Sequence, residues 1–144
     1  MLKLMEAHGL WTAIREYAAS HALWGVCAGA ILIASEVRNP AQACLRLINI
    51  RATRNFYGSQ RDSFKARIDM AAISSKSSAL APDASLVECD FIRAPLLEPL
   101  SADVEVLAKH QGCAALLRRD RVLASSFHTE LGDESRLHEY FLNI

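Results

Sequence analysis

The pattern of hydrophobic and polar positions predicts helices and strands that alternate along the first third of the chain. Apolar residues recur at helical spacing through residues 1–20, with a break at Gly9. The short apolar run Leu23–Val26 predicts a strand, and Ala28–Ala34 predicts a buried helix. Asn39-Pro40 ends this unit, because the residue before a proline disfavours helix.

Further along, the pattern favours strands. Leu47–Thr53 alternates apolar with polar residues, as a half-buried strand does. The remaining strand predictions are Phe64–Asp69, Leu86–Ile92, Val104–Lys109, Ala114–Arg118 and Val122–Phe127. We expect the last three of these strands to form an antiparallel meander. The small polar stretch Ser74–Pro82 predicts an exposed loop.

The chain ends in a predicted helix. Asp133 is the expected N-cap, and Leu137, Tyr140 and Phe141 form its apolar face. The predicted order is helix, strand, helix, several strands and a final helix. This order favours an α/β sandwich with a mixed sheet. At 144 residues we expect a single domain over 1–144.

Composition narrows the class of protein. Hydrophobic residues make up 51% and charged residues 22%, as in folded globular proteins. Sixteen basic and sixteen acidic residues cancel, so no basic field favours nucleic acid or an anionic membrane. The beginning of the chain lacks the pattern of a signal peptide. The four cysteines form no CxxC pair and the five histidines no HxxxH pair, so we expect no zinc site. Reduced thiols predict a cytoplasmic protein.

The most informative pentapeptide is Gly25-Val26-Cys27-Ala28-Gly29, between a predicted strand and a predicted helix. A nucleophile on such a sharp turn requires flanking glycines that avoid clashes. The amides at the start of the following helix favour a thiolate and a developing oxyanion. The alternative interpretation is a buried cysteine between two packing glycines.

A second group follows the last predicted strand, in the segment Ser126-Phe127-His128-Thr129-Glu130-Leu131. A cysteine nucleophile requires a base, and the base requires an acceptor that orients it. His128 is the candidate base and Glu130 the candidate acceptor. The alternative is a structural histidine at a strand end. Because Cys27 and His128 are 101 residues apart, only the fold can bring them together.

With these motifs the chain resembles the class I, triad-type glutamine amidotransferases. Within them it is most similar to the glutaminase subunits of two-subunit pyridoxal 5′-phosphate synthases. Besides GVCAG and SFHTEL, the likeness rests on RNFYG at 54–58, FIRAP at 91–95 and RLHEYFL at 136–142. It covers nearly the whole chain.

The resemblance implies a fold, a reaction and a partner. The fold is a flavodoxin-like, three-layer α/β sandwich with a mixed, mostly parallel sheet. The reaction is hydrolysis of L-glutamine to glutamate and ammonia without metal or organic cofactor. Cys27 would be the nucleophile, His128 the acid and base, and Glu130 its orienting group. The partner would be a (β/α)₈-barrel synthase subunit that receives the ammonia.

Four more residues acquire roles from the resemblance. The Ala28 amide would serve as an oxyanion donor. Arg54, Ile92 and Arg93 would contact glutamine, since a guanidinium offers a planar fork of donors to the α-carboxylate. Without the resemblance, both arginines would be interpreted as solvated or ion-paired.

The chain also departs from the family pattern. Family members usually begin with a further segment that carries a G-G-E-S loop and a second oxyanion amide, and no GGES occurs here. We therefore expect an N-terminally truncated member. Arg46 stands where the family has glycine, Ser59 where it has arginine, and Thr129 where it has proline.

Three hypotheses follow. The first is an ammonia-producing glutaminase subunit. The second is a catalytically impaired, truncated homologue that at most binds the synthase partner. The third is a different cysteine hydrolase of the DJ-1/PfpI type, which also places its cysteine on an elbow.

Overall fold

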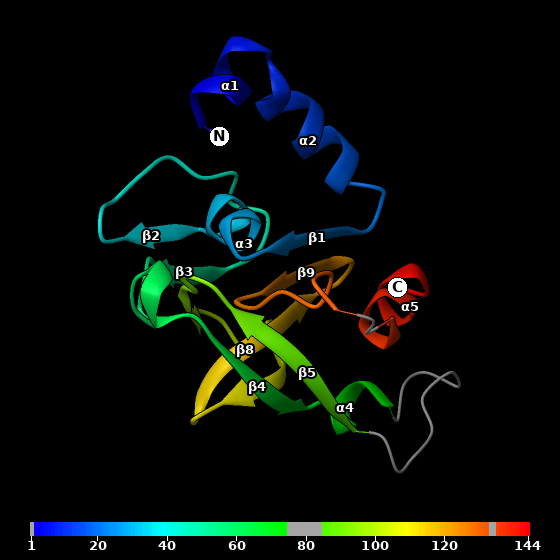
Figure 1. The fold of residues 1–144 in the computed structure, drawn as a ribbon. Helices are drawn as coiled ribbons and strands as arrows, with labels where there is room; N and C mark the ends of the chain where they lie inside the picture. Colours follow the sequence, from blue (N-terminus) through cyan, green and yellow to red (C-terminus); the bar gives the residue numbers. More distant parts are fainter. Residues whose placement is uncertain (1, 75–84, 133–134) are drawn as a thin grey trace.

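The computed structural model describes residues 2–74, 85–132 and 135–144 (Figure 1). The helices are α1 Leu2–Ala7, α2 Leu10–Ala18, α3 Ala28–Ile33, α4 Ala71–Ser74 and α5 Arg136–Leu142. The strands are β1 Leu23–Val26, β2 Glu36–Arg38, β3 Ile50–Thr53, β4 Phe64–Asp69, β5 Leu86–Phe91, β6 Leu96–Pro99, β7 Glu105–His110, β8 Cys113–Arg119 and β9 Val122–Ser125. A 3₁₀ turn, η1, spans Gln60–Asp62.

Seven of these strands form one curled sheet in the order β1-β9-β8-β6-β3-β2, with β7 on the other edge of β8. The strands β4 and β5 form a separate antiparallel ribbon. The expected meander is confirmed, because β7, β8 and β9 pair in succession as antiparallel neighbours.

The mixed sheet of the α/β fold is confirmed, but the expectation of mostly parallel pairing requires correction. Only β1–β9 and β2–β3 are parallel within the described sheet. The pairs β3–β6, β6–β8, β7–β8 and β8–β9 are antiparallel. For β7–β8 and β8–β9 the physical reason is the short connection, because a tight turn such as that at Gly112 permits only antiparallel neighbours.

The sheet separates two apolar cores, which gives the fold its three layers. On one face, α3 packs against the sheet, and Met5 of α1 belongs to the same buried cluster. On the other face lie the β4–β5 ribbon and α5 (Figure 1). The central strand β8 serves both, since Leu117 belongs to the first core and Leu116 to the second. Successive side chains of a strand point to opposite faces.

The predicted helices of the N-terminal third are confirmed. Gly9 separates α1 from α2 with a left-handed φ of 63°. The strand at Leu23–Val26 has the predicted bounds, and the helix after Cys27 ends at Ile33. None of the described helices combines the length and the apolar character needed to cross a bilayer.

Four short elements lack a predicted counterpart: β2, β6, α4 and the 3₁₀ turn η1. The strand β2 has only three residues, of which Val37 alone is buried. The strand β6 begins directly after Pro95 and pairs with β3 and with β8. Short strands carry little periodicity, so tertiary pairing determines them.

The ends of other elements differ from the prediction by a few residues. The predicted strand at 47–53 begins at Ile50, and the one at 122–127 ends at Ser125. The last helix begins at Arg136, where the Glu139 amide bonds to the Ser135 carbonyl at 2.9 Å. The predicted N-cap Asp133, and the predicted loop beyond Ser74, lie outside the described residues.

Candidate active site

Parallel pairing of β1 with β9 brings together the two segments that carry Cys27 and His128. Val26 is in register with Ser125, so Cys27 and His128 both follow the carboxyl ends of neighbouring strands. The Cys27 amide donates to the Ser125 carbonyl at 2.8 Å, which ties the elbow to the end of β9. Both side chains line one cavity of about 660 Å³.

The cysteine sits on a strained turn. Cys27 has a φ of 48° and a ψ of −100° as the residue before α3. A non-glycine residue with positive φ is uncommon and is concentrated at functional sites. The half-buried thiol donates to the Ile92 carbonyl at 3.6 Å. The Ala28 amide is the first of α3, where helix geometry supplies no intrahelical acceptor.

His128 is held from both sides. Its Nδ1 lies 2.6 Å from Glu130 Oε1. Its backbone forms a two-way bridge with Asp90 on β5, at 2.8 and 2.9 Å. Hydrogen bonding to Cys27 is the main cause that raises the pKa of His128 to about 9, with Glu130 adding to it and burial opposing it. The imidazole therefore bonds to the carboxylate and shares one cavity with the thiol.

Glu130 is held in turn by the backbone. Burial raises its pKa, but the hydrogen bond from His128 and the Thr129 amide at 3.1 Å to Oε2 lower it overall. A proline, which the family resemblance leads us to expect at position 129, could not donate that bond. The Thr129 hydroxyl is buried and has no hydrogen-bond partner among the described residues.

Two serines position the segment before His128. Ser125 and Ser126 are fully buried. The Ser125 hydroxyl accepts from the Trp24 indole at 3.0 Å and donates to the Phe127 carbonyl at 3.2 Å. The Ser126 amide bonds to the Ala115 carbonyl at 2.9 Å. These bonds turn the chain out of β9 toward the cavity.

The arginine segments meet at the same cavity. Arg54, Asn55, Ile92 and Arg93 line it together with Cys27, Ala28, His128 and Glu130. Tyr57 connects the two segments, because its ring packs edge-on against Phe91 at 5.3 Å and its amide donates to the Ala94 carbonyl. The structure thus brings together all seven residues that the sequence singled out.

The two arginines have amide partners. Arg54 Nη1 donates to Gln42 Oε1 at 3.0 Å, and Arg93 Nε donates to Asn55 Oδ1 at 3.4 Å. Gln42 and Asn55 had no assigned role at the level of sequence. Asn55 lies inside the RNFYG segment, and its φ of 53° could not be deduced from the pattern. Among the described residues, no cluster of three or more His, Cys, Asp or Glu side chains has the arrangement of a metal site.

The departures from the family pattern have local structural consequences. Arg46 has a φ of 57°, in the left-handed region that favours glycine. Ser59 caps η1, because its amide and hydroxyl both donate to Asp62 Oδ2, at 2.8 and 2.7 Å. Neither residue lines the cavity that contains Cys27.

Comparison with known proteins agrees with this geometry. A protein named pyridoxal 5′-phosphate synthase subunit PdxT from Thermoanaerobacter sp. (strain X514) is 40% identical over 122 residues, 85% of this chain. Proteins of the same name from Kosmotoga olearia and Deinococcus radiodurans are 40% and 39% identical over 99% and 100% of it. The chain spans 60% of the Thermoanaerobacter protein and about 70% of the other two.

A solved structure described as a glutamine amidotransferase superposes with a TM-score of 0.82 at 36% identity. The superposition covers 98% of this chain and 70% of the chain of that structure. The model of the SNO glutamine amidotransferase family matches residues 1–144. This match decides against the DJ-1/PfpI-type alternative as the family of the chain. The chain belongs to the SNO glutamine amidotransferase family.

Proposed function

We propose that this chain is a glutaminase subunit that hydrolyses L-glutamine to L-glutamate and ammonia. The observation that carries the proposal is the convergence of Cys27, His128 and Glu130 in one cavity that two arginines also line. A thiol on a strained elbow, a base in the same cavity and a carboxylate bonded to the base form the arrangement required for nucleophilic attack on an amide.

In the first half of the reaction, His128 holds the proton that Cys27 has given up, and the sulfur attacks the side-chain amide carbon. The Ala28 amide donates to the oxygen of the tetrahedral intermediate. The carbon–nitrogen bond then breaks, and His128 protonates the leaving amine to release ammonia. A γ-glutamyl thioester remains on Cys27.

In the second half, His128 removes a proton from water, and the hydroxide attacks the thioester. The carbon–sulfur bond breaks, the sulfur recovers its proton from His128, and glutamate leaves. Glu130 fixes the imidazole through Nδ1 in both halves and stabilises its charged form. Arg54 and Arg93 hold the α-carboxylate of the substrate, with the Ile92 backbone beside it.

The names of the relatives support a role in the synthesis of pyridoxal 5′-phosphate. We propose that the ammonia passes to a (β/α)₈-barrel synthase subunit that binds this chain. The four cysteines are free thiols, which supports a cytoplasmic location.

The test is covalent labelling with a glutamine-mimicking electrophile, diazo-oxonorleucine, followed by peptide mass spectrometry. It is performed on the whole chain with the synthase subunit present, alongside a measurement of ammonia release from L-glutamine. Cys27→Ser and His128→Asn remove the nucleophile and the base. Cys44→Ala, at a half-buried thiol outside the cavity, is the matched control.

We expect an adduct on Cys27 alone and ammonia release that both site variants abolish and the control retains. A folded chain that binds the synthase subunit but forms no adduct and releases no ammonia would overturn the proposal. That result would favour the second hypothesis, a homologue that only binds its partner.

A further inference from the structure

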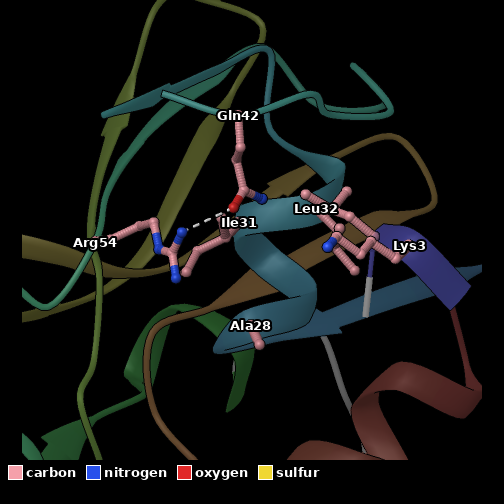
Figure 2. A pocket seen from close by; sticks show the side chains of 7 residues that line it. Lys3, Ala28, Ile31, Leu32, Gln42 and Arg54 are labelled. Atoms are coloured by element: carbon pink, nitrogen blue, oxygen red, sulfur yellow. Dashed lines mark hydrogen bonds between the residues drawn. The ribbon is translucent and has the colours of Figure 1, made fainter. Parts of the chain in front are cut away.

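A second cavity, of about 430 Å³, adjoins the first and shares Ala28, Ile31 and Arg54 with it. Figure 2 shows Gln42 on one side of this cavity, with its carboxamide oxygen aimed at the Arg54 guanidinium. The distance from Arg54 Nη1 to Gln42 Oε1 is 3.0 Å. Arg54 therefore lies at the boundary of the two cavities; Gln42 lines the second cavity and not the first, and Cys27 lines the first and not the second.

The loop that carries Gln42 is fixed to the protein by backbone bonds. The amides of Leu45, Arg46 and Leu47 bond to the carbonyls of Leu32, Ala34 and Ile33 at the end of α3, at 2.6 to 3.1 Å. The Arg15 guanidinium of α2 also donates to the Leu45 carbonyl at 3.2 Å. Gln42 is thus held half-buried on a fixed loop, which makes it a suitable support for a second side chain.

The partner of Arg54 is neutral, and this distinguishes Arg54 from Arg51, which lies on the strand β3 just before it. Arg51 lies 2.9 Å from Glu36 and 3.9 Å from Glu98, so two carboxylates balance its charge. In the described part of the chain, Arg54 has no carboxylate partner. Gln42 occupies one of the five N–H donors of Arg54 and leaves its positive charge unpaired.

We propose that Gln42 is a positioning residue, which orients the Arg54 guanidinium toward the carboxylate of an amino-acid substrate without neutralising it. The inference rests on the proposed function, in which Arg54 receives the α-carboxylate. A glutamate at position 42 would form a charge-assisted bond and compete with the substrate. An apolar side chain would leave the guanidinium free to rotate.

The experiment compares two isosteric variants with a charge control. Gln42→Met keeps the volume and removes the acceptor, whereas Gln42→Glu keeps the acceptor and adds a negative charge. Gln111→Glu adds the same charge at an exposed turn outside both cavities. Saturation kinetics of Cys27 labelling give the apparent affinity for diazo-oxonorleucine and the maximal rate. Iodoacetamide, which has no carboxylate, reports the intrinsic reactivity of the thiol.

We expect Gln42→Met to weaken the apparent affinity for diazo-oxonorleucine about tenfold, the effect of one hydrogen bond to a charged group. Gln42→Glu should weaken it further. The maximal rate, the iodoacetamide rate and the Gln111→Glu control should remain at wild-type values. If Gln42 served only the structure, the glutamate of Gln42→Glu could replace it, because it has the same shape and also accepts a hydrogen bond. Wild-type affinity for diazo-oxonorleucine in Gln42→Glu would therefore overturn the inference.

A second measurement separates this inference from the proposed function. Phenylglyoxal modifies arginines without turnover, and mass spectrometry reports the rate at Arg54 and at Arg51 in the same sample. We expect Gln42→Met to change the Arg54 rate severalfold and to leave Arg51 unchanged. If the Arg54 rate changes in this way but diazo-oxonorleucine does not label the wild type, the Gln42–Arg54 contact is supported and the proposed glutaminase function is contradicted. Equal Arg54 rates in the wild type and both variants would overturn the inference.

Discussion

At the scale of single residues, strain and function coincide at the cavity. Cys27, Asn55 and Arg93 have φ angles of 48°, 53° and 50°, and all three line it. A left-handed non-glycine residue costs on the order of 1–3 kcal/mol and persists only where its surroundings impose it. Here the surroundings are the β1–β9 pair and the aromatic contact between the two arginine segments. The left-handed conformations of these three residues therefore lower the stability of the folded protein, and they direct the three side chains into the cavity.

The His128 imidazole leads to a prediction about pH. Its pKa is raised from 6.5 to about 9, chiefly by hydrogen bonding to Cys27. Because the folded pKa lies above the unfolded one, the stabilisation is complete below pH 6.5 and is lost as the pH rises through about 9. We expect an NMR titration midpoint near 9 for the wild type and one closer to 6.5 for Cys27→Ala.

Denaturant unfolding at several pH values checks the same linkage. The advantage of the wild type over Cys27→Ala should shrink between pH 6.5 and 9. Cys44→Ala is the control, because Cys44 bonds to the Ser35 carbonyl far from the imidazole in sequence and outside its cavity. A Cys27→Ala midpoint equal to that of the wild type would contradict the contact between thiol and imidazole.

At the scale of elements, the two glycines around Cys27 differ in what they do. A Cβ on Gly25 would lie 2.6 Å from Ile33 Cδ1 and 2.7 Å from the Gly29 carbonyl carbon. A Cβ on Gly29 would meet nothing within 4 Å. The close approach of β1 to α3 therefore depends on Gly25 alone. The idea that both glycines avoid clashes is correct only for the first.

Gly25→Ala and Gly29→Ala form a matched pair that tests this difference. Overpacking against backbone should make Gly25→Ala less stable by about 1–3 kcal/mol. Gly29→Ala, inside a helix, should be neutral or more stable by up to about 1 kcal/mol. Urea unfolding of both variants measures the difference in free energy. Equal destabilisation of the two would contradict the close packing of β1 on α3.

At the scale of the whole molecule, one sheet stabilises two cores. Leu117 faces the helical core and Leu116 the core under the ribbon, and both are fully buried. The residues of the candidate site are divided between these layers: Cys27 precedes α3, whereas the backbone of His128 is bridged to β5. The site is therefore intact only when both layers are packed on the sheet.

This shared sheet predicts cooperative unfolding. Leu116→Ala and Leu117→Ala should each lower the stability by about 2–5 kcal/mol. The two tryptophans report the two layers, since Trp11 packs against the helical core and Trp24 against the other. Single-tryptophan variants made with Trp11→Phe or Trp24→Phe should show coincident transitions in both leucine variants. Separate transitions would mean that the layers unfold independently.

Much of this protein is determined by local sequence. The helices before Cys27 and the strand at Leu23–Val26 lie where the apolar spacing predicts them, and the meander strands occupy the predicted apolar runs. The motifs around Cys27 and His128 predict which side chains react. Their chemistry depends on residue type, which is readable without a fold.

What the sequence could not determine depends on long-range pairing. The parallel register of β1 with β9 and the bridge from Asp90 to His128 join segments that lie far apart in the chain. The bond between Gln42 and Arg54 is also long-range. The strand β6 likewise depends on its pairing with β3 and β8, because its own sequence shows no strand pattern. Periodicity records which face of an element is buried, but not against what. Only tertiary packing therefore decided that the thiol, the imidazole and the two arginines share one cavity.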